Sequence, residues 1–228
     1  MKDPQNWYVL GNAHLTNFFV NEDINVGELQ SALKAYAQSE KNMSELSVNP
    51  DVYYNRATIY EYLERYNEAV ADYNTAYKID PNLDADKKAS NVIGFVHRSY
   101  NAIVNKGKLK SNRLTAMVKS IPHEIAGMDS YKICDISQLL NDENPGMMVS
   151  AKIVNNIHKD SDVPMCFLLV DYKHNFCVAS IYHMSKSVLD KIKPGSDVLI
   201  KNPHLVLVQL SFKGYAYNYQ CLKITDNS

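Results

Sequence analysis

Several features that mark common protein classes are missing from this sequence. The longest uninterrupted apolar runs, such as Cys166 to Val170, are far shorter than the roughly 18 residues that cross a bilayer. The first 19 residues contain no continuous apolar stretch of the kind that marks a secretory signal. The 4 cysteines include no C-x-x-C pair, which favours reduced thiols over a disulfide framework. We therefore expect no membrane span and a protein of the cytoplasm and nucleus.

Motifs of common catalytic sites are also missing. The sequence contains no G-x-S-x-G, no P-loop, no G-x-G-x-x-G and no H-E-x-x-H. Four possible zinc ligands fall around one expected hairpin, at Cys166, His174, Cys177 and His183. Alternation along strands would place them on both faces of the sheet, and no two of them form a short ligand pair. We expect no catalytic residues, no cofactor and no metal, and hence a protein that is not an enzyme.

Carboxylates are absent from one long segment, although the chain as a whole is nearly neutral. The 228 residues carry 24 basic and 25 acidic side chains. Residues 87–123 hold 8 of the basic and none of the acidic ones, whereas residues 1–86 hold 6 basic and 14 acidic side chains. Such an uneven distribution indicates separate surfaces for separate partners.

The first half contains a helical repeat. Residues 50–83 fill a 34-residue helix-turn-helix template, with aromatic residues at Tyr53, Tyr60 and Tyr73 and a closing Pro81. Small residues at positions 57, 69 and 76 allow two antiparallel helices to approach closely. Arg56 departs from the template, which usually has Leu at that position. The spacing predicts a tetratricopeptide-type repeat.

A second repeat precedes this one. Trp7, Leu10 and Gly11 match the first helix of the template, and residues 32–36 match the second, with an enlarged loop between 17 and 31. Apolar positions through residues 84–105 have the spacing of an amphipathic helix, which we expect to cap the solenoid. Because such arrays need about three or more units, we expect that further repeats precede Trp7.

The second half changes to strand periodicity. Five apolar or alternating stretches follow one another, and a short helix at 186–192 lies between the third and the fourth. The expected strands are 147–157, 164–172, 176–184, 197–210 broken at Pro203, and 215–224. This order is that of an OB barrel. The predicted fold is thus α + β in two domains, with tetratricopeptide repeats (1–105), a basic and then acidic linker (106–145) and a five-stranded OB-fold barrel (146–228).

One candidate site lies in the concave groove of the repeats. Packing does not determine the side chains there, and those expected to face the groove are Tyr8, Asn12, Asp51, Tyr54, Thr58 and Glu61. Their polar, aromatic and acidic character suits a peptide with a positive end, because carboxylates accept charge-assisted hydrogen bonds from an amine or guanidinium. Two simpler interpretations stay open: Asp51 caps its helix, and Glu61 is a solvated charge.

A second candidate site lies in the segment that has no carboxylates. Lys106, Lys108, Lys110 and Arg113 form a natural clamp for a phosphate backbone or an acidic protein surface. In the simpler alternative, the positive charges of the lysines interact favourably with the negative end of a helix dipole at the C-terminal end of a helix.

The expected barrel offers a third possibility. Phe167, Tyr172, Phe176 and Tyr182 would have to be exposed for single-stranded nucleic acid to stack on them. A protein-interaction or structural role is the alternative, because several of these rings are needed for the core of the barrel.

The order of these features resembles one family. Residues 7–12 (WYVLGN), 49–51 (NPD), 55–58 (NRAT), 80–81 (DP) and 106–108 (KGK), followed by an OB-like tail, are similar to the tetratricopeptide repeat protein 5 (Strap) family. The resemblance covers nearly the whole chain.

The resemblance implies a non-catalytic adaptor. Members of this family are described as binding the N-terminal peptide of nascent tubulin at the ribosome, in tubulin mRNA autoregulation, and as stress-responsive transcription cofactors in the cytoplasm and nucleus. By position, Asp51 would contact the peptide, and Lys106, Lys108 and Lys110 would contact the ribosome. The expected partners are therefore short peptides or proteins, such as nascent tubulin and transcription cofactors, and the ribosome or RNA. A nucleic-acid-binding OB protein whose repeats are only a scaffold is a further alternative.

Overall fold

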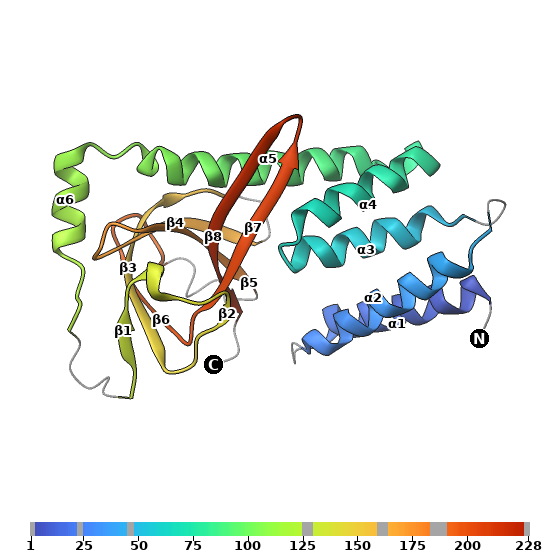
Figure 1. Cartoon of the computed structure of the whole chain (residues 1–228), viewed down its shortest axis with the longest axis horizontal. Coiled ribbons are helices and arrows are strands. Elements are labelled where there is room, and N and C mark those ends of the chain that lie inside the picture. The colour runs from blue at the N-terminus through green and yellow to red at the C-terminus, as the bar shows by residue number, and fades with distance from the viewer. Residues whose placement is uncertain are drawn as a thin grey trace. The chain divides into compact units, whose positions relative to one another are not determined.

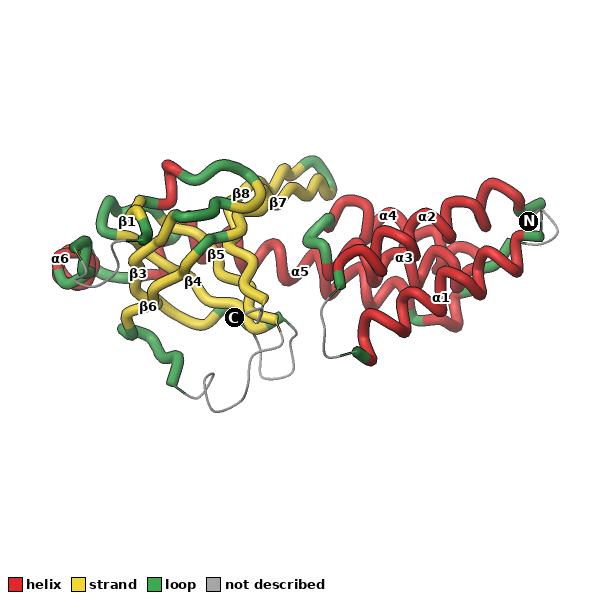
Figure 2. Tube along the Cα trace, turned by 90° about the horizontal axis from the view of Figure 1, so that it is seen from below, coloured by secondary structure: helices red, strands yellow, loops and turns green. Residues whose placement is uncertain are grey.

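The computed structural model of the chain describes residues 3–21, 25–44, 48–124, 130–158, 164–182 and 191–225. The chain divides into two compact units. The helical unit contains residues 1–94 with 210–214, and the strand unit contains residues 95–209 with 215–228. Figure 2 shows that helices and strands occupy largely separate stretches of the chain. Residues 95–104, expected in the repeat domain, therefore cluster with the strand unit.

The helical unit is built from two helix pairs and the start of a long helix. Within each pair the helices lie side by side (Figure 1). The elements are α1 (Pro4–Val20), α2 (Val26–Asn42), α3 (Pro50–Tyr62), α4 (Tyr66–Ile79), the short 3-10 helix η1 (Pro81–Leu83) and α5 (Ala85–Val104). The amphipathic helix predicted at 84–105 is confirmed by α5. The prediction of an enlarged loop between residues 17 and 31 is wrong, since most of these residues belong to α1 and α2.

Local signals explain where these helices begin. Asp3 and Asn49 accept hydrogen bonds from the backbone N–H groups of Gln5 (2.8 Å) and Asp51 (3.0 Å), and a proline follows each cap at the first helical position. Such caps satisfy amides that have no partner inside the helix. A Cβ atom at Gly11 would lie 2.5 Å from the buried ring of Tyr36. Only glycine lets α1 and α2 approach this closely.

The contacts of Arg56 explain why an arginine stands where the repeat template usually has leucine. Its guanidinium donates two hydrogen bonds to the Asp72 carboxylate, with Nε to Oδ2 at 2.6 Å and Nη2 to Oδ1 at 2.9 Å. Its Nη1 donates a third bond to Glu40 Oε2 at 2.6 Å. The cluster joins α2, α3 and α4. Burial lowers the pKa of Arg56, but the hydrogen bonds and charges of Asp72 and Glu40 together outweigh it and raise this pKa. A charged fork therefore replaces an apolar contact at this position.

The strand unit contains one sheet. Its hydrogen-bonded path runs β1-β3-β4-β5-β8-β7-β2, and β6 also pairs with β3. The strands are β1 (Lys132–Cys134), β2 (Asp142–Glu143), β3 (Met147–Asn156), β4 (Met165–Asp171), β5 (Phe176–Tyr182), β6 (Asp197–Lys201), β7 (His204–Phe212) and β8 (Tyr215–Thr225). Three short helices, η2 (Lys106–Lys108), α6 (Ser111–Lys119) and η3 (Ile136–Gln138), lie among the residues before β3. The expected closed barrel of five strands is not confirmed, since eight strands are described and their path does not close.

Two expectations about the strands need correction. The broken fourth strand is instead two strands: β6 pairs with β3, whereas β7 pairs antiparallel with β2. The segment 106–145, expected as a linker, contains α6, β1 and β2. The later part of this segment is tied to the sheet by the buried Asp171. This carboxylate accepts hydrogen bonds from the backbone amides of Ile136 (2.8 Å), which lies in the segment, and of Asn175 (2.9 Å). The helix expected at 186–192 falls mostly outside the described residues.

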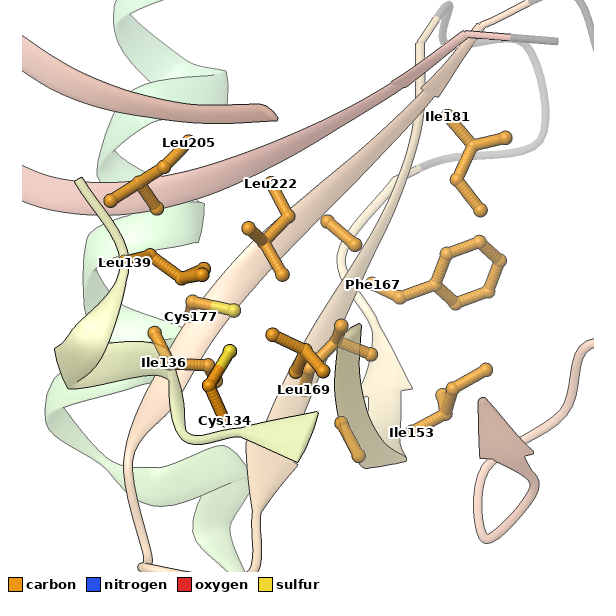
Figure 3. Packing of buried hydrophobic residues seen from close by; sticks show 13 residues of the cluster. Cys134, Ile136, Leu139, Ile153, Phe167, Leu169, Cys177, Ile181, Leu205 and Leu222 are labelled. Atoms are coloured by element: carbon orange, nitrogen blue, oxygen red, sulfur yellow. The ribbon is translucent and has the colours of Figure 1, made fainter. Parts of the chain in front are cut away.

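One apolar cluster fills a large part of the core of the strand unit. Figure 3 shows side chains from β3, β4 and β5 meeting those of the segment before β3 and of β7 and β8. Its members include Ile136, Leu139, Leu169, Leu205 and Leu222, each at most 7% exposed. The cysteines at 134 and 177 point into the same cluster, and all four cysteines are buried and none of them is in a disulfide. Burial raises the pKa of the Cys177 thiol, so it behaves as a core residue.

Candidate functional site

The structure joins three of the expected groove residues through one tyrosine of α4. Tyr73 Oη donates a 2.8 Å hydrogen bond to Glu61 Oε2, lies 3.4 Å from Thr58 Oγ1, and its ring meets that of Tyr54 edge-on at 5.4 Å. Burial raises the pKa of Glu61, although the bond from Tyr73 and the charge of Lys88 oppose this effect. Glu61 is therefore a half-buried carboxylate that a hydrogen bond orients, and not a fully solvated charge.

A second cluster surrounds Asn12 on α1. Asn12 Oδ1 accepts hydrogen bonds from Tyr36 Oη (2.7 Å) and from Asn55 Nδ2 (3.0 Å). The Tyr8 ring lies 6.5 Å from that of Tyr36, centroid to centroid. Asn12 also lines an open hollow of ≈ 470 Å³ on α1, together with Thr16 and four neighbours. The amide of Asn12 is thereby held in place on a surface that is open to a ligand.

Asp51 lies in the first turn of α3 but does not cap the helix. The cap is Asn49, whose side chain accepts the hydrogen bond from the Asp51 amide. This excludes the interpretation of Asp51 as a helix cap. The half-buried carboxylate of Asp51 stands where the positive end of the helix dipole favours an anion. It is thus a negative group at one end of the helix that also carries Tyr54, Thr58 and Glu61.

The basic segment has an unusual backbone. Lys106, Gly107 and Lys108 all have positive φ angles, at 48°, 60° and 59°. For the two lysines this conformation costs roughly 1–2 kcal/mol per residue. The segment turns between α5 and α6 and exposes both lysine side chains.

Gly107 is the residue that fastens this turn to the sheet. A Cβ atom there would lie 2.5 Å from Val154 Cγ1, 3.1 Å from Leu168 Cδ2 and 3.3 Å from Asn155 Oδ1. A side chain would therefore push the turn away from β3 and β4. The glycine holds Lys106 and Lys108 against a rigid surface, which restricts the positions that their charges can occupy.

The basic residues can be interpreted either as a clamp for an anionic partner or as charges stabilised by a helix dipole, and their places on the helices distinguish the two. Lys106 and Lys108 follow the end of α5, where cations are favourable. Lys110 and Arg113 instead lie at the start of α6, where the dipole disfavours them, and Lys110 makes no side-chain cap. Both are exposed, and none of the ion pairs among the described residues includes any of these four side chains. The dipole explanation therefore accounts for only half of the group.

The sheet buries two of the aromatic residues that nucleic acid would need. Phe167 and Tyr182 are 2% and 3% exposed, whereas Tyr172 and Phe176 are half-buried. Lys173 Nζ lies 5.7 Å from the ring centre of Tyr172. A stacking platform across β4 and β5 would thus have only two of its four expected rings.

The structure also limits other kinds of site. In the part of the chain that it describes, no three His, Cys, Asp or Glu side chains come together to hold a metal, and His183 lies outside that part. Over the same residues, no helix is both long and apolar enough to span a membrane.

Sequence reasoning missed Tyr36, Asn55 and Tyr73 as groove residues. Tyr36 and Tyr73 occupy template positions whose rings are fully buried, so the pattern indicates packing alone. Their hydroxyl groups nevertheless reach Asn12 and Glu61. A buried tyrosine whose hydroxyl needs a partner is the signal that could have found them.

Comparisons with known proteins agree with this architecture. Residues 130–228 match the model of the tetratricopeptide repeat protein 5 OB fold domain, and residues 50–83 match that of a tetratricopeptide repeat, as predicted. The curated proteins named tetratricopeptide repeat protein 5 from Bos taurus and Mus musculus are 30% identical to the chain, and the Homo sapiens protein is 29% identical. Each match covers 97% of this chain but 53% of the relative. The chain thus spans about half the length of the curated relatives that it matches.

Proposed function

This chain belongs to the tetratricopeptide repeat protein 5 family, and we propose that it acts as an adaptor that binds a ribosome through its basic turn and a nascent peptide through its repeats. Tetratricopeptide repeats and an OB fold make an adaptor-type protein, which holds partners together without chemistry of its own. The peptide would be the N-terminus of nascent tubulin. The adaptor would work in the cytoplasm, with a cofactor role in the nucleus as the second candidate.

The observation that carries the ribosome arm is the placement of the four basic side chains. Residues 87–123 contain no carboxylate, and the turn that follows α5 is fixed on the sheet by Gly107. Cations held at a rigid turn lose little conformational freedom when they meet phosphate. Those at the start of α6 are also relieved of an unfavourable dipole once an anion binds.

Co-sedimentation with ribosomes tests this arm. We expect the triple variant Lys106→Glu, Lys108→Glu, Lys110→Glu to lose association, and its matched control is the same reversal at three exposed lysines of the helical unit, Lys34, Lys41 and Lys78. The binding constant of the wild type should fall steeply as salt rises. A plot of its logarithm against the logarithm of the salt concentration should have a slope of about −0.7 to −0.9 for each phosphate contacted. Association that survives the triple variant, or that both variants lose equally, would contradict the proposal.

The peptide arm rests on the two acidic residues of α3. Asp51 near its start and Glu61 near its end bracket Tyr54 and Thr58, so a peptide along α3 would meet negative charge at both ends. Loss of one charge-assisted hydrogen bond costs about 1.5–3 kcal/mol. Titration of the chain with the tubulin N-terminal peptide should therefore show affinity reduced about tenfold or more in Asp51→Asn.

The matched control is the same peptide with an acetylated terminus. Because acetylation removes the positive amine, we expect this peptide to bind weakly to the wild type and to be insensitive to Asp51→Asn. If both peptides bind the wild type equally, the acidic groove does not read a positive terminus. The transcription-scaffold role would then be favoured for the repeats.

A further inference from the structure

A pocket of ≈ 350 Å³ lies within the strand unit, beside the basic turn. One wall is a face of α5, which carries His97 and Asn101 one helical turn apart, with Asn105 directly after the end of the helix, and the opposite side is the end of β3. The lining residues are His97, Arg98, Asn101, Ala102, Asn105, Gly107, Lys108, Asn155, Asn156 and Ile157. The pocket is at the lower end of the size range of small-ligand sites.

The described lining of the pocket is rich in carboxamides and carries positive charge. None of the ten described residues that line the pocket is acidic, four are asparagines, and Arg98 and Lys108 supply positive charge. Each carboxamide offers both a donor and an acceptor. Asn155 Oδ1 is buried and accepts no hydrogen bond from the described residues. Such a lining suits a ligand that combines an anionic group with a planar edge of donors and acceptors.

The sheet is irregular at this place. The register between β3 and β4 shifts between Ile153 and Asn155. A bulge of this kind re-aims the side chains that follow it and is common next to functional sites. Here it brings Asn155 and Asn156 to the pocket, opposite α5.

Both nitrogens of the His97 ring have partners. Its Nδ1 lies 3.2 Å from Tyr217 Oη, and its Nε2 lies 2.8 Å from Asn101 Nδ2. The Tyr217 ring meets it edge-on at 5.7 Å. His97 is exposed and lines the pocket, so with both nitrogens engaged its ring would meet a ligand by stacking, as such rings do with nucleobases.

We infer that this pocket binds a single nucleoside phosphate unit, with its base against His97 and the asparagines and its phosphate toward Lys108 and Arg98. The source is either a free mononucleotide or one unstacked nucleotide of an RNA strand. The RNA source rests on the proposed function, since the strand would run over Lys106 and Lys108. The inference goes beyond a phosphate clamp because it assigns a site that reads the base.

Calorimetric titration of the whole chain tests the pocket directly. The probes are the four nucleoside 5′-monophosphates, inorganic phosphate and a short single-stranded RNA. The test variant is Asn105→Asp with Asn156→Asp, two exposed positions, and the matched control is Asn91→Asp, an exposed asparagine of α5 outside the pocket. We expect at least one mononucleotide to bind and the test variant to weaken it about tenfold or more, because the two new carboxylates lack the N–H donors that the carboxamides offer the base and add negative charge that repels the phosphate.

Each outcome decides the question. Mononucleotide binding that the test variant weakens and the control leaves unchanged supports the site. If inorganic phosphate binds as tightly as every mononucleotide, the pocket does not read a base and the inference falls. If no mononucleotide and no RNA binds, or if the test variant binds like the control, it also falls.

The RNA probe separates the two sources and the two proposals. If RNA binds and free mononucleotides do not, weakening of RNA binding by the test variant assigns the pocket to a nucleotide of the strand. Ribosome association that is lost in the lysine variant but kept in the test variant leaves the proposed function standing and overturns the RNA source alone.

Discussion

Replacing Arg56 by Leu, the residue that the repeat template has at this position, should destabilise the helical unit. The change removes two hydrogen bonds to Asp72, at 2.6 and 2.9 Å, and one to Glu40, at 2.6 Å. The side chain of Asp72 is 11% exposed, so its carboxylate would be left buried without its partner. Breaking a buried pair in this way costs about 3–5 kcal/mol.

The contribution of Glu40 to this cost is small. Its side chain is 41% exposed, so solvent screens its charge and the lost contact is worth at most about 1 kcal/mol. Leu is a good helix former, which offsets part of the loss. We therefore expect Arg56→Leu to lower the free energy of unfolding by about 3 kcal/mol.

Urea denaturation followed by circular dichroism at a helix wavelength measures this loss. A shift of the midpoint without a change of slope would show lost stability and not a changed denatured state. The matched control is Arg65→Leu, because the ion pair of Arg65 with Glu68 is exposed on both sides and should be worth about 1 kcal/mol or less. The double variant Arg56→Leu, Asp72→Leu should recover most of the loss, since no buried charge remains.

Two results would refute this reasoning. If Arg56→Leu costs no more than Arg65→Leu, then Asp72 does not depend on the guanidinium. If the double variant is as unstable as Arg56→Leu, the cost lies in the shape of the side chain and not in the charge of Asp72. A coupling energy of at least about 2 kcal/mol in the double-mutant cycle is what the geometry of the fork requires.

Two further predictions concern the candidate sites. Gly107→Ala places a Cβ 2.5 Å from Val154 Cγ1 at a positive φ, so thermal unfolding should show a loss of about 2–4 kcal/mol and ribosome association should weaken; an unchanged melting temperature would contradict the role of the glycine. Burial raises the pKa of Glu61 above its usual 4.5, so its ionisation lowers the free energy of unfolding. This loss is absent below about pH 4 and grows as pH rises through the folded-state pKa. Glu61→Gln should accordingly be more stable than the wild type at neutral pH and lose this advantage near pH 4 in urea titrations, whereas a difference independent of pH would show that charge is not its cause.

The groove residues of α3 and the basic turn differ in what holds them in place. Tyr54, Thr58 and Glu61 are positioned by a tyrosine on the next helix, so their geometry depends on the packing of one helix pair. The basic turn depends on a glycine that leaves room for Val154 and Leu168. Substitutions at Tyr73 and at Gly107 therefore disturb the two surfaces independently.

Local sequence determined the repeat and the basic segment. The repeat at 50–83 follows from small and aromatic residues at fixed spacing, since each helix must bury a stripe against its neighbour. The absence of carboxylates from residues 87–123 is a matter of composition and needs no fold to be seen. The start of α3 was also readable, although Asn49 and not Asp51 proved to be the cap.

Tertiary structure alone decided the features that depend on distant residues. The short strands β1 and β2 carry too few residues to show a period of two, and they exist because β3 and β7 supply their hydrogen bonds. Whether 197–210 is one strand or two depended on the partners of each half, which are β3 and β2.

The grouping of residues into the candidate sites also depended on the tertiary structure. That Tyr73 serves Glu61, and that Asn105 and Asn156 line one pocket, follows from contacts between segments far apart in the chain. Spacing along the sequence indicates which face of an element is apolar, because that depends on a fixed rotation per residue. It carries no information about which polar side chains from two elements meet, because the packing of those elements sets that distance.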